Sequence, residues 1–509
     1  MAKARNIMIL GTGSDVGKSV LAAGLCRILK QDGYQVAPFK AQNMALNSFI
    51  TPEGGEMGRA QVVQAEAAGI EPHVDMNPIL LKPTSNVGSQ VILHGKVLGN
   101  FTAEAYYKKK VDLVQQVMES YHRLEKQYEV LVIEGAGSAA EINLRDKDLV
   151  NLSMAGRVAA PVLLVADIDR GGVFASIVGH MELFTSEEKE LVKGFIINKF
   201  RGDPSLLTSG LEFIEARTGK PVLGLVHYFT DIQIPEEDSV ALDLKMRLAQ
   251  ARAKDQVRIG IVRLPHISNY TDFDSLEQEP SVSLSYFTSP ELVFDQDLVI
   301  LPGSKNTLDD LQYLHSQGIA EAIISFHGKG GNVVGICGGY QMLGARVLDP
   351  LGVESDLREI AGLNLLAMET ELLGEKVTTQ VKARIIWEEL ADPGEQVHGY
   401  EIHMGRSRPL GPTTPLLEIV ERNDQPVHVS DGLVSDDGRV WGSYVHGLFD
   451  NDGLRHRLIS HLKATGDVES TKEGLGSFRR WKEEQYDKLA SHLRGHLDMD
   501  RIYQIIGLK

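Results

Sequence analysis

Residues 11–19 read GTGSDVGKS and lie between an apolar run at residues 7–10 and a helical pattern at residues 21–29. In the helical pattern, apolar residues recur every three or four positions, which is typical of a helix with one buried face. A glycine-rich loop between a strand and the N-terminus of a helix presents backbone N–H groups and the positive end of the helix dipole, and both bind phosphate. The segment therefore predicts a phosphate-binding loop at the start of an α/β domain.

The residue types in this loop indicate how a nucleoside triphosphate is held. We expect Lys18 to reach the β- and γ-phosphates and the hydroxyl of Ser19 to ligate Mg²⁺. The general pattern G-x-x-x-x-G-K-[ST] has glycine where this sequence has Thr12, so a glycine-rich turn with a chance GKS is the alternative. ATP and Mg²⁺ are the predicted cofactors. The predicted nucleotide-binding residues are Thr12, Gly13, Asp15, Val16, Gly17, Lys18, Ser19 and Asn198.

Short β-branched runs alternate with helical patterns through the rest of the first half, which is typical of a doubly wound parallel sheet. These runs lie at residues 34–39, 130–133, 162–166, 195–197 and 222–226. Glu134 directly follows one run, and Asn198 and Lys199 follow another. Because α/β folds bind ligands at the carboxyl ends of their strands, we expect Glu134 to hold the metal ion together with Ser19.

Composition restricts the class of protein. The chain has 509 residues, with 52 Lys and Arg against 69 Asp and Glu, and its formal charge of −17 argues against sequence-independent binding to nucleic acid or anionic lipid. Its two cysteines, Cys26 and Cys337, cannot build a disulfide framework or a four-thiolate zinc site. No apolar run reaches the length of a signal sequence or a membrane span. We therefore expect a cytoplasmic protein with neither nucleic acid nor membrane as a partner, and the oligomeric state is left open.

A second alternating series follows the first. A charged, alanine-rich stretch around residues 238–256 predicts a helical connector, and a new apolar run begins at residue 258. Further buried-strand runs lie at residues 298–301, 332–336 and 440–444. We therefore divide the chain into a first domain over residues 1–237, a connector over 238–251, a second domain over 252–452 and a helical extension over 453–509.

The second domain contains GICGG, residues 335–339, at a predicted strand-to-helix turn. A nucleophile flanked by small residues at such a turn forms a nucleophile elbow, and the helix N-terminus lowers the pKa of a thiol there. A lone cysteine is usually an inert core residue, but this context favours Cys337 as a catalytic nucleophile. The backbone N–H groups of Gly338 and of Gly303, in LPGSKNT, are the expected oxyanion hole.

His446 lies in WGSYVHGLFD, residues 441–450, directly after an apolar run. A histidine about a hundred residues after the cysteine is a common position for the base of a thiol hydrolase. The carboxylate that usually completes such a triad lies two positions beyond the histidine, where this sequence has Leu448. We predict His446 as the base, and the group that orients it is left open.

Several segments resemble a known family. GTGSDVGKS, PFKAQNMALNS (38–48), MNPILLKPTS (76–85), VIEGAGS (132–138), DIDRGGVFAS (167–176) and INKFRGD (197–203) resemble the dethiobiotin synthetase-like ATPase domain of the cobyric acid synthase family. GICGG, LPGSKNT and WGSYVHGLFD resemble its cobalamin-type glutamine amidotransferase domain over about residues 252–450. The resemblance implies that a threonine at position 12 is normal in the ATPase domain and that a missing carboxylate at position 448 is normal in the amidotransferase domain. The resemblance implies two doubly wound α/β domains, an N-terminal P-loop domain and a C-terminal class I glutamine amidotransferase-like domain.

A nucleotide-phosphate site and a thiol glutaminase on one chain indicate one reaction type. ATP activates a carboxylate as an acyl phosphate, and ammonia from glutamine displaces the phosphate to leave an amide. The family resemblance implies the acceptor, adenosylcobyrinic acid a,c-diamide, which is amidated at its b, d, e and g side chains to give adenosylcobyric acid in cobalamin biosynthesis. We expect Glu56 to be a second metal ligand. The candidate acceptor-binding residues are Lys40, Asn43, Asn47, Lys82, Arg170 and Lys199.

Two other functions are kept as alternatives. The a,c-diamide synthase shares both domains, although QNMALNS and MNPILLKP favour the first assignment. A different class is an ATP-dependent switch with an inactive glutaminase-like domain. The intact pair Cys337 and His446 argues against such a switch, as does Gly13 at the position of the signature lysine of ParA-type ATPases.

Overall fold

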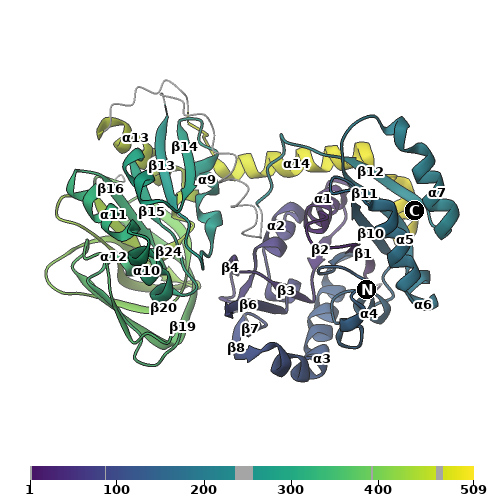
Figure 1. The fold of residues 1–509 in the computed structure, drawn as a ribbon, viewed down its shortest axis with the longest axis horizontal. Coiled ribbons are helices and arrows are strands. Elements are labelled where there is room, and N and C mark those ends of the chain that lie inside the picture. Colours follow the sequence, from purple (N-terminus) through teal and green to yellow (C-terminus); the bar gives the residue numbers. More distant parts are fainter. Residues whose placement is uncertain (1–2, 86–87, 236–255, 391–393, 466–473, 509) are drawn as a thin grey trace. The chain divides into compact units, whose positions relative to one another are not determined.

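Two compact units make up the computed structural model, which describes residues 3–85, 88–235, 256–390, 394–465 and 474–508 (Figure 1). Unit 1 consists of Met1–Ala45, Glu56–Pro235 and Lys482–Lys509, and unit 2 of Leu46–Gly55 and Glu236–Trp481. The structure therefore differs from a strictly linear division of the chain: a short segment of the first half packs with unit 2, and the end of the chain packs with unit 1. The connector expected at residues 238–251 lies outside the described residues.

The main sheet of unit 1 has six parallel strands in the order β12-β11-β10-β1-β9-β2. The run at residues 7–10 is fully buried at the centre of this sheet, which explains why it is continuously apolar. The strands are β1 (Arg5–Gly11), β2 (Val36–Phe39), β9 (Val130–Glu134), β10 (Val162–Asp167), β11 (Val192–Phe200) and β12 (Val222–His227).

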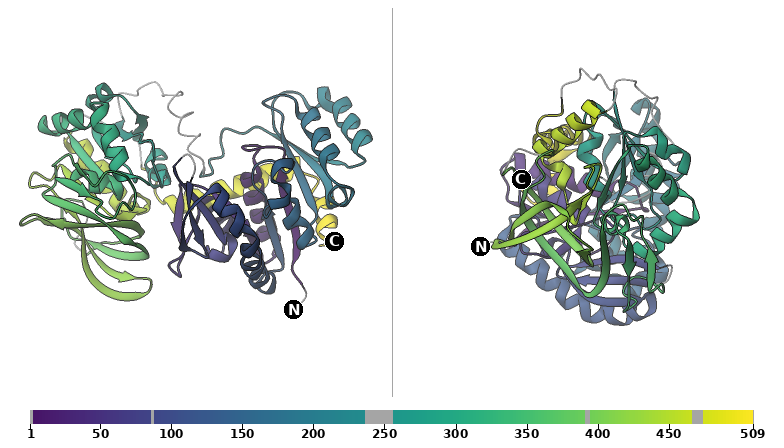
Figure 2. Two further views of the ribbon diagram at one scale, coloured as in Figure 1. Left: turned by 60° about the horizontal axis from the view of Figure 1, so that its bottom comes forward. Right: turned by 90° about the vertical axis from the view of Figure 1, so that its left-hand side faces the viewer.

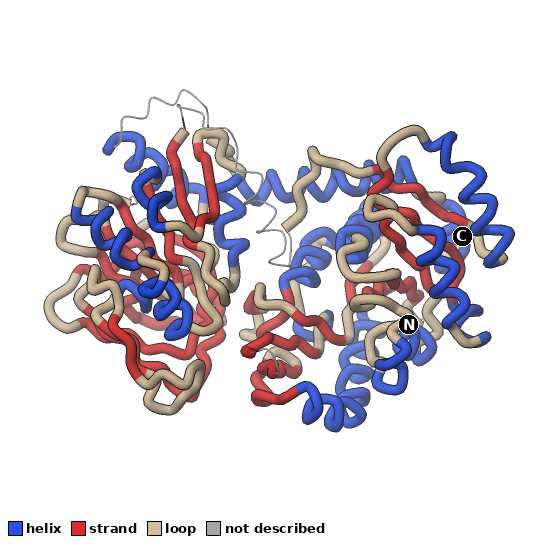
Figure 3. The backbone as a smooth tube through the Cα atoms, viewed as in Figure 1, coloured by secondary structure: helices blue, strands red, loops and turns tan. Residues whose placement is uncertain are grey.

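Helices and a second sheet complete unit 1 (Figure 3). Its helices are α1 (Lys18–Gln31), α2 (Arg59–Ala68), α3 (Ala103–Gln127), α4 (Leu152–Arg157), α5 (Val173–Leu183), α6 (Ser186–Leu191), α7 (Thr208–Thr218) and α15 (Met499–Ile506). The second sheet, which the sequence analysis did not predict, has the order β3-β6-β7-β8. Its strands are β3 (Gln42–Met44), β6 (Ile79–Ser85), β7 (Gly88–Leu93) and β8 (Lys96–Thr102), and the short β5 (Glu56–Gly58) precedes α2.

The parallel part of the unit 2 sheet has the strand order β14-β13-β15-β16-β23. These strands are β13 (Val257–Val262), β14 (Val282–Phe287), β15 (Leu298–Leu301), β16 (Asn332–Ile336) and β23 (Val440–Ser443). The helices of this unit are α9 (Asp274–Glu277), α10 (Thr307–Ser316), α11 (Ile319–Gly328), α12 (Gly338–Leu343) and α13 (Asp452–Thr465). The helix α14 (Phe478–His496) contains the boundary between the units, and most of it, from Lys482 on, belongs to unit 1. The predicted parallel α/β arrangement is confirmed for both units.

A largely antiparallel extension continues the unit 2 sheet beyond β23 and was not predicted. Its long strands β19 and β20 pair along most of their length and form the curved green ribbon in Figure 2. The strands of this region are β17 (Arg346–Leu348), β18 (Glu359–Ala361), β19 (Met368–Ile385), β20 (Gln396–Pro409), β21 (Thr414–Arg422), β22 (Gln425–Val434) and β24 (Val445–His446). Within the described ranges, no helix has both the length and the apolar composition needed to cross a bilayer.

Candidate active sites

The phosphate loop of unit 1 connects β1 to α1, as the sequence predicts. Gly17 caps the helix with φ 100° and ψ 20°, a conformation that favours glycine. A Cβ at this position would also lie 2.1 Å from Nδ2 of Asn198, which donates a hydrogen bond of 2.8 Å to the carbonyl of Val16. The positive φ and the close approach of Asn198 therefore both favour glycine at position 17, and Asn198 fixes the backbone of the loop.

Lys18 is buried at the first position of α1, and its ammonium group is held by backbone carbonyls. Its Nζ donates to the carbonyl of Gly13 over 2.7 Å and to that of Gly137 over 3.0 Å. Thr12 forms an isolated β-bridge with Ser138, which ties the loop to the segment after β9. The lysine thus lies between two glycine-rich segments, with its charge directed into the loop.

Glu134 at the end of β9 gathers polar groups from three elements. Its Oε1 accepts hydrogen bonds of 2.8 Å from the hydroxyl of Ser19 and from Nζ of Lys40, and Gln64 donates to Oε2. Burial by itself would raise the pKa of this carboxyl, but the charge of Lys40 and the hydrogen bonds from Lys40, Gln64 and Ser19 outweigh it and lower the pKa. A hydroxyl beside an ionised carboxylate is a pair of hard oxygen ligands, which suits Mg²⁺.

Other predicted residues of unit 1 lie around the same loop and carboxylate. Asn43 donates to Oε1 of Gln61 over 3.1 Å, and the Gln61 amide lies 3.4 Å from Glu134. Nζ of Lys199 donates to the carbonyl of Asp15, and the Arg170 guanidinium lies 3.4 Å from the Asp15 carboxylate. The candidate residues Lys40, Asn43, Arg170, Asn198 and Lys199 are therefore brought close to the phosphate loop or to Glu134.

The remaining candidates have other contacts. Glu56 and Lys82 are both buried and form an ion pair with a distance of 2.8 Å, so the charge of Glu56 is balanced by a lysine. Asn47, an expected acceptor contact, belongs to unit 2, where its Oδ1 accepts a hydrogen bond of 3.1 Å from the Tyr270 amide. Because the structure places Asn47 with the second unit, we omit it from the acceptor-binding group.

Cys337 in unit 2 follows β16 at the strained turn that the sequence predicts. Its φ of 51° and ψ of −108° are unusual for a residue with a side chain. A Cβ at Gly339 would lie 1.9 Å from the carbonyl oxygen of Leu301, and one at Gly335 would lie 2.6 Å from the carbonyl oxygen of Gly339. The glycines around the cysteine are therefore a steric requirement of the elbow.

Of the two predicted oxyanion-hole glycines, Gly338 directly follows Cys337 and Gly303 lies in the loop after β15. A Cβ at Gly338 would lie 2.8 Å from the amide nitrogen of Ser304, and a Cβ at Gly303 would lie 3.2 Å from Cε1 of His446. The strand-to-helix turn, the LPGSKNT loop and the histidine thus converge on one point. Backbone N–H groups next to a nucleophile are the arrangement that stabilises a tetrahedral oxyanion.

The group that orients His446 is Asp272, which the sequence analysis missed. Its Oδ2 lies 2.6 Å from Nδ1 of His446, and its Oδ1 accepts a hydrogen bond of 3.0 Å from the amide of Gly447. Asp272 lies in a 3₁₀ turn, η4 (Tyr270–Phe273), at the carboxyl edge of the parallel sheet. An acidic residue in a loop at that edge was the signal that could have indicated it.

The surroundings of His446 favour its protonated form. Burial lowers the pKa of a histidine, but here the charges of Asp272 and Cys337 and the hydrogen bonds to both groups outweigh it and raise the pKa to about 10. A pKa near 10 means that the imidazole is protonated at neutral pH. Leu448, at the usual carboxylate position, is 1% exposed and lies in the hydrophobic core.

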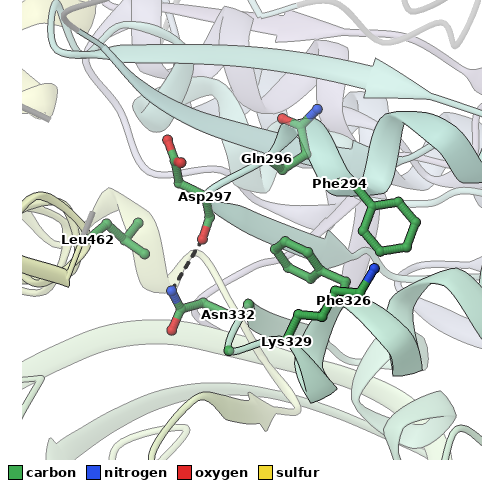
Figure 4. Close-up of a pocket in the computed structure, with 9 residues that line it drawn as sticks. Phe294, Gln296, Asp297, Phe326, Lys329, Asn332 and Leu462 are labelled. Atoms are coloured by element: carbon green, nitrogen blue, oxygen red, sulfur yellow. Dashed lines mark hydrogen bonds between the residues drawn. The ribbon is translucent and has the colours of Figure 1, made fainter. Parts of the chain in front are cut away.

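A pocket of about 470 Å³ in unit 2 lies away from this constellation. Phe294, Phe326 and Lys329 line it, and Asn332 donates to the carbonyl of Asp297 across one side (Figure 4). Asn332 begins β16, whereas Cys337 follows its last residue. The pocket is therefore at the amino end of the strand, and the nucleophile is at the carboxyl end.

The chain is similar to known proteins over both of its units. Residues 258–454 match the CobB/CobQ-like glutamine amidotransferase domain, and residues 7–241 match the CobQ/CobB/MinD/ParA nucleotide binding domain. A cobyric acid synthase of Syntrophobacter fumaroxidans is 59% identical over 512 residues, which cover 100% of each chain. The chain belongs to the cobyric acid synthase family.

Other cobyric acid synthases are similar over nearly the same length. The relative from Photorhabdus laumondii subsp. laumondii is 53% identical, with 98% of this chain and 97% of the relative covered. The relative from Yersinia enterocolitica is 51% identical, with 98% of both chains covered. As a member of the cobyric acid synthase family, the chain is a glutamine amidotransferase with a P-loop nucleotide-binding domain, and the predicted family and enzyme class are confirmed.

Proposed function

We propose that the chain uses ATP and glutamine to amidate the b, d, e and g carboxylates of adenosylcobyrinic acid a,c-diamide, giving adenosylcobyric acid. The name shared by its full-length relatives supports this acceptor. The observation that carries the reaction type is the triad of unit 2, in which Cys337 at a strained elbow faces a histidine held by Asp272. On one chain, the glutaminase domain would supply ammonia and the nucleotide-binding domain would activate the acceptor carboxylate, and amide formation needs both.

Unit 1 activates the carboxylate. An acceptor carboxylate oxygen attacks the γ-phosphorus of ATP, the bond to the β,γ-bridging oxygen breaks, and an acyl phosphate and ADP form. Lys18 exchanges its carbonyl partners for phosphate oxygens and neutralises charge that develops on them. Ser19 and Glu134 are the residues that would hold Mg²⁺, which supplies further charge neutralisation at the phosphates. Ammonia then attacks the acyl carbon, phosphate leaves, and the nitrogen loses a proton to give the amide.

Unit 2 supplies the ammonia. The Cys337 thiolate attacks the side-chain carbonyl of glutamine, and the amide N–H groups near Gly303 and Gly338 stabilise the oxyanion. His446, protonated at rest, gives its proton to the departing ammonia, and it then accepts a proton from the water that clears the thioester. Asp272 holds Nδ1 throughout, so that Nε2 faces the reacting atoms.

Positive side chains near the phosphate loop would receive the acceptor. Lys40 and Lys199 lie beside Glu134 and Asp167, where an anionic acceptor can exchange with the carboxylate partners. Arg170 is largely exposed at the same edge, and Asn43 offers an amide near Glu134. Lys82 and Glu56 form a buried ion pair within unit 1. We propose that Lys82 leaves this pair to bind the acceptor and that Glu56 then becomes the second metal ligand.

Mass spectrometry of the acceptor tests this function. The chain is incubated with ATP, Mg²⁺, glutamine and corrinoids of different amidation state, and each conversion of a carboxyl –OH to –NH₂ changes the corrinoid mass by a fixed amount. Four conversions of the a,c-diamide are expected. Conversion of unamidated cobyrinic acid at the a and c positions would instead indicate the a,c-diamide synthase, and glutamine hydrolysis without any amide product would indicate an ATP-dependent switch.

A further inference from the structure

Residues 46–55 are part of unit 2, although the chain on both sides of them belongs to unit 1. The segment contains the short strand β4 (Ser48–Ile50). Ile50 packs with Tyr400 and Ile402 in a small buried cluster, and the side-chain amide of Gln380 donates to the Ile50 carbonyl. These contacts make the segment an integral part of the glutaminase unit.

Two hydrogen bonds connect this segment to the turn that carries Asp272. Oδ1 of Asn47 accepts from the amide of Tyr270 over 3.1 Å, and the amide of Ser48 donates to Oδ1 of Asn269 over 3.1 Å. Asn269 begins the turn in the left-handed conformation, with φ 52° and ψ 38°, and its carbonyl accepts from the Asp272 amide. Residues 47 and 48 therefore fix the backbone from which the Asp272 carboxylate extends to the histidine.

A third contact reaches the histidine from its other side. The hydroxyl of Tyr400 donates to the carbonyl of Ser48 over 3.3 Å. The Tyr400 ring stacks on the ring of His446, with centroids 5.2 Å apart and an interplanar angle of 18°, and Phe49 packs against the edge of Tyr400. Ser48 thus anchors the stacking partner of His446, while Asn47 and Ser48 anchor its carboxylate partner.

We propose that Asn47 and Ser48 are positioning residues of the glutaminase site. They act through Asp272 and Tyr400, which together fix the ring of His446 in the plane and direction that proton transfer to the leaving nitrogen requires. This inference rests on the proposed glutaminase role of Cys337 and His446. It extends that site beyond residues 258–454, which match the amidotransferase domain, to a segment within residues 7–241, which match the nucleotide-binding domain.

Asn47→Ala in the full-length protein tests the proposal. The substitution removes the acceptor for the Tyr270 amide but leaves the phosphate loop and Cys337 intact. We expect kcat for glutamine to fall about tenfold or more with little change in KM, because a misplaced general acid slows chemistry more than binding. Amidation with ammonium in place of glutamine is expected to stay at the wild-type rate. Tyr400→Phe, which keeps the stacked ring and removes the bond to Ser48, is expected to give the same pattern in weaker form.

Asn6→Ala is the matched control. Asn6 is a buried asparagine of unit 1 whose amide bonds Tyr121 and Val158, so its loss removes buried hydrogen bonds without reaching His446. We expect Asn6→Ala to lower thermal stability and to leave unchanged the pH above which glutaminase activity falls. Asn47→Ala is expected to move that pH to a lower value, because a displaced Asp272 raises the His446 pKa less. Wild-type kcat and pH profile in both Asn47→Ala and Tyr400→Phe would overturn the proposal, as would a parallel loss of ammonium-dependent amidation. Cys337→Ser measured alongside separates the two claims, because full glutaminase activity in that variant would overturn the proposed function itself.

Discussion

His446 and Asp272 are 174 positions apart in the sequence, yet their side chains lie 2.6 Å apart in a buried site. The contact has two effects on the imidazole: it selects the tautomer with a proton on Nδ1, and it stabilises the positive charge. A pKa raised to about 10 means that the imidazolium persists through neutral pH and is lost as the pH rises through that value. We therefore expect the histidine to act first as an acid.

Asp272→Asn tests this assignment through the pH dependence. An amide at this position removes the charge that raises the His446 pKa and can present an N–H to Nδ1, which favours the wrong tautomer. We expect kcat with glutamine to fall by about two orders of magnitude or more. The alkaline limit of the profile should move down from near pH 10 toward the ordinary range of histidine. Initial glutaminase rates measured between neutral and alkaline pH give both kcat and the pH above which activity falls. If that pH is the same as in the unsubstituted protein, the proposed role of Asp272 is contradicted.

Leu448→Glu tests whether a carboxylate at the usual triad position improves the site. Leu448 is 1% exposed in the apolar core, and His446 already has its carboxylate partner. A buried glutamate there loses its hydration without a counter-charge, so it is expected to destabilise the unit and to stay protonated. We expect glutamine hydrolysis no faster than in the unsubstituted protein. A several-fold faster rate in a steady-state assay would show that Asp272 does not fill the triad position.

At the scale of elements, the elbow depends on close backbone packing between β16, α12 and the end of β15. A Cβ at Gly339 would lie 1.9 Å from the carbonyl oxygen of Leu301 at the end of β15, and backbone cannot move away as a flexible side chain does. We expect Gly339→Ala to destabilise unit 2 by at least about 1–3 kcal/mol, the usual cost of overpacking, and to abolish the glutaminase reaction. Gly328→Ala, at the end of α11 with no atom within 4 Å of the added carbon, is the control. Thermal unfolding with an equal decrease for both variants would refute the steric argument.

Most of the parallel strands were predictable because they are short, apolar and largely buried runs, as in β10 and β16. The parallel strand β14 was not predicted, and three of its six residues are only partly buried. The antiparallel strands were missed because their faces are unevenly buried. In β19 a stretch of partly exposed residues interrupts the alternation, so neither periodicity is clear. Its structure is set by pairing with β20, which no local pattern encodes.

The site residues also differ in whether nearby or distant parts of the sequence determine their surroundings. Lys18 and Cys337 were predictable because a loop or turn of a few residues determines their environment. Asp272 was not, because its partner is distant in the sequence and the turn around it carries no motif. Asn47 was assigned to the acceptor from its neighbours in the sequence, whereas residues 46–55 pack with the other unit. Local sequence therefore predicted the loop around Lys18 and the turn around Cys337, but not the contacts that distant segments make with His446.

At the scale of the whole molecule, the nucleotide-binding and amidotransferase domains match different parts of the chain, so we expect substitutions to separate their two chemistries. Lys18→Ala is expected to abolish amide formation with either glutamine or ammonium, because activation of the carboxylate precedes attack by any nitrogen. Removing a preorganised charge at the transferring phosphoryl costs about two to three orders of magnitude or more in rate. Amide product measured by mass with each nitrogen donor at saturating ATP checks this. Near-normal amidation by the variant would contradict the phosphate-loop assignment.

Cys337→Ser makes the opposite separation. A serine hydroxyl is close in size to the thiol, but it ionises far less readily and is a much weaker nucleophile at neutral pH. Glutamine-dependent amidation is therefore expected to disappear. Unit 1 needs only a nitrogen nucleophile, so ammonium at mildly alkaline pH should restore amidation of the same carboxylates, with ATP consumed for each amide.

His446→Ala should give the same pattern less completely, since a cysteine remains. The measurement is corrinoid mass with glutamine and with ammonium for each variant. If the serine variant uses glutamine at the unsubstituted rate, Cys337 is a core residue. If a folded, ATP-binding serine variant is not rescued by ammonium, activation and ammonia release are not divided between the units as we propose.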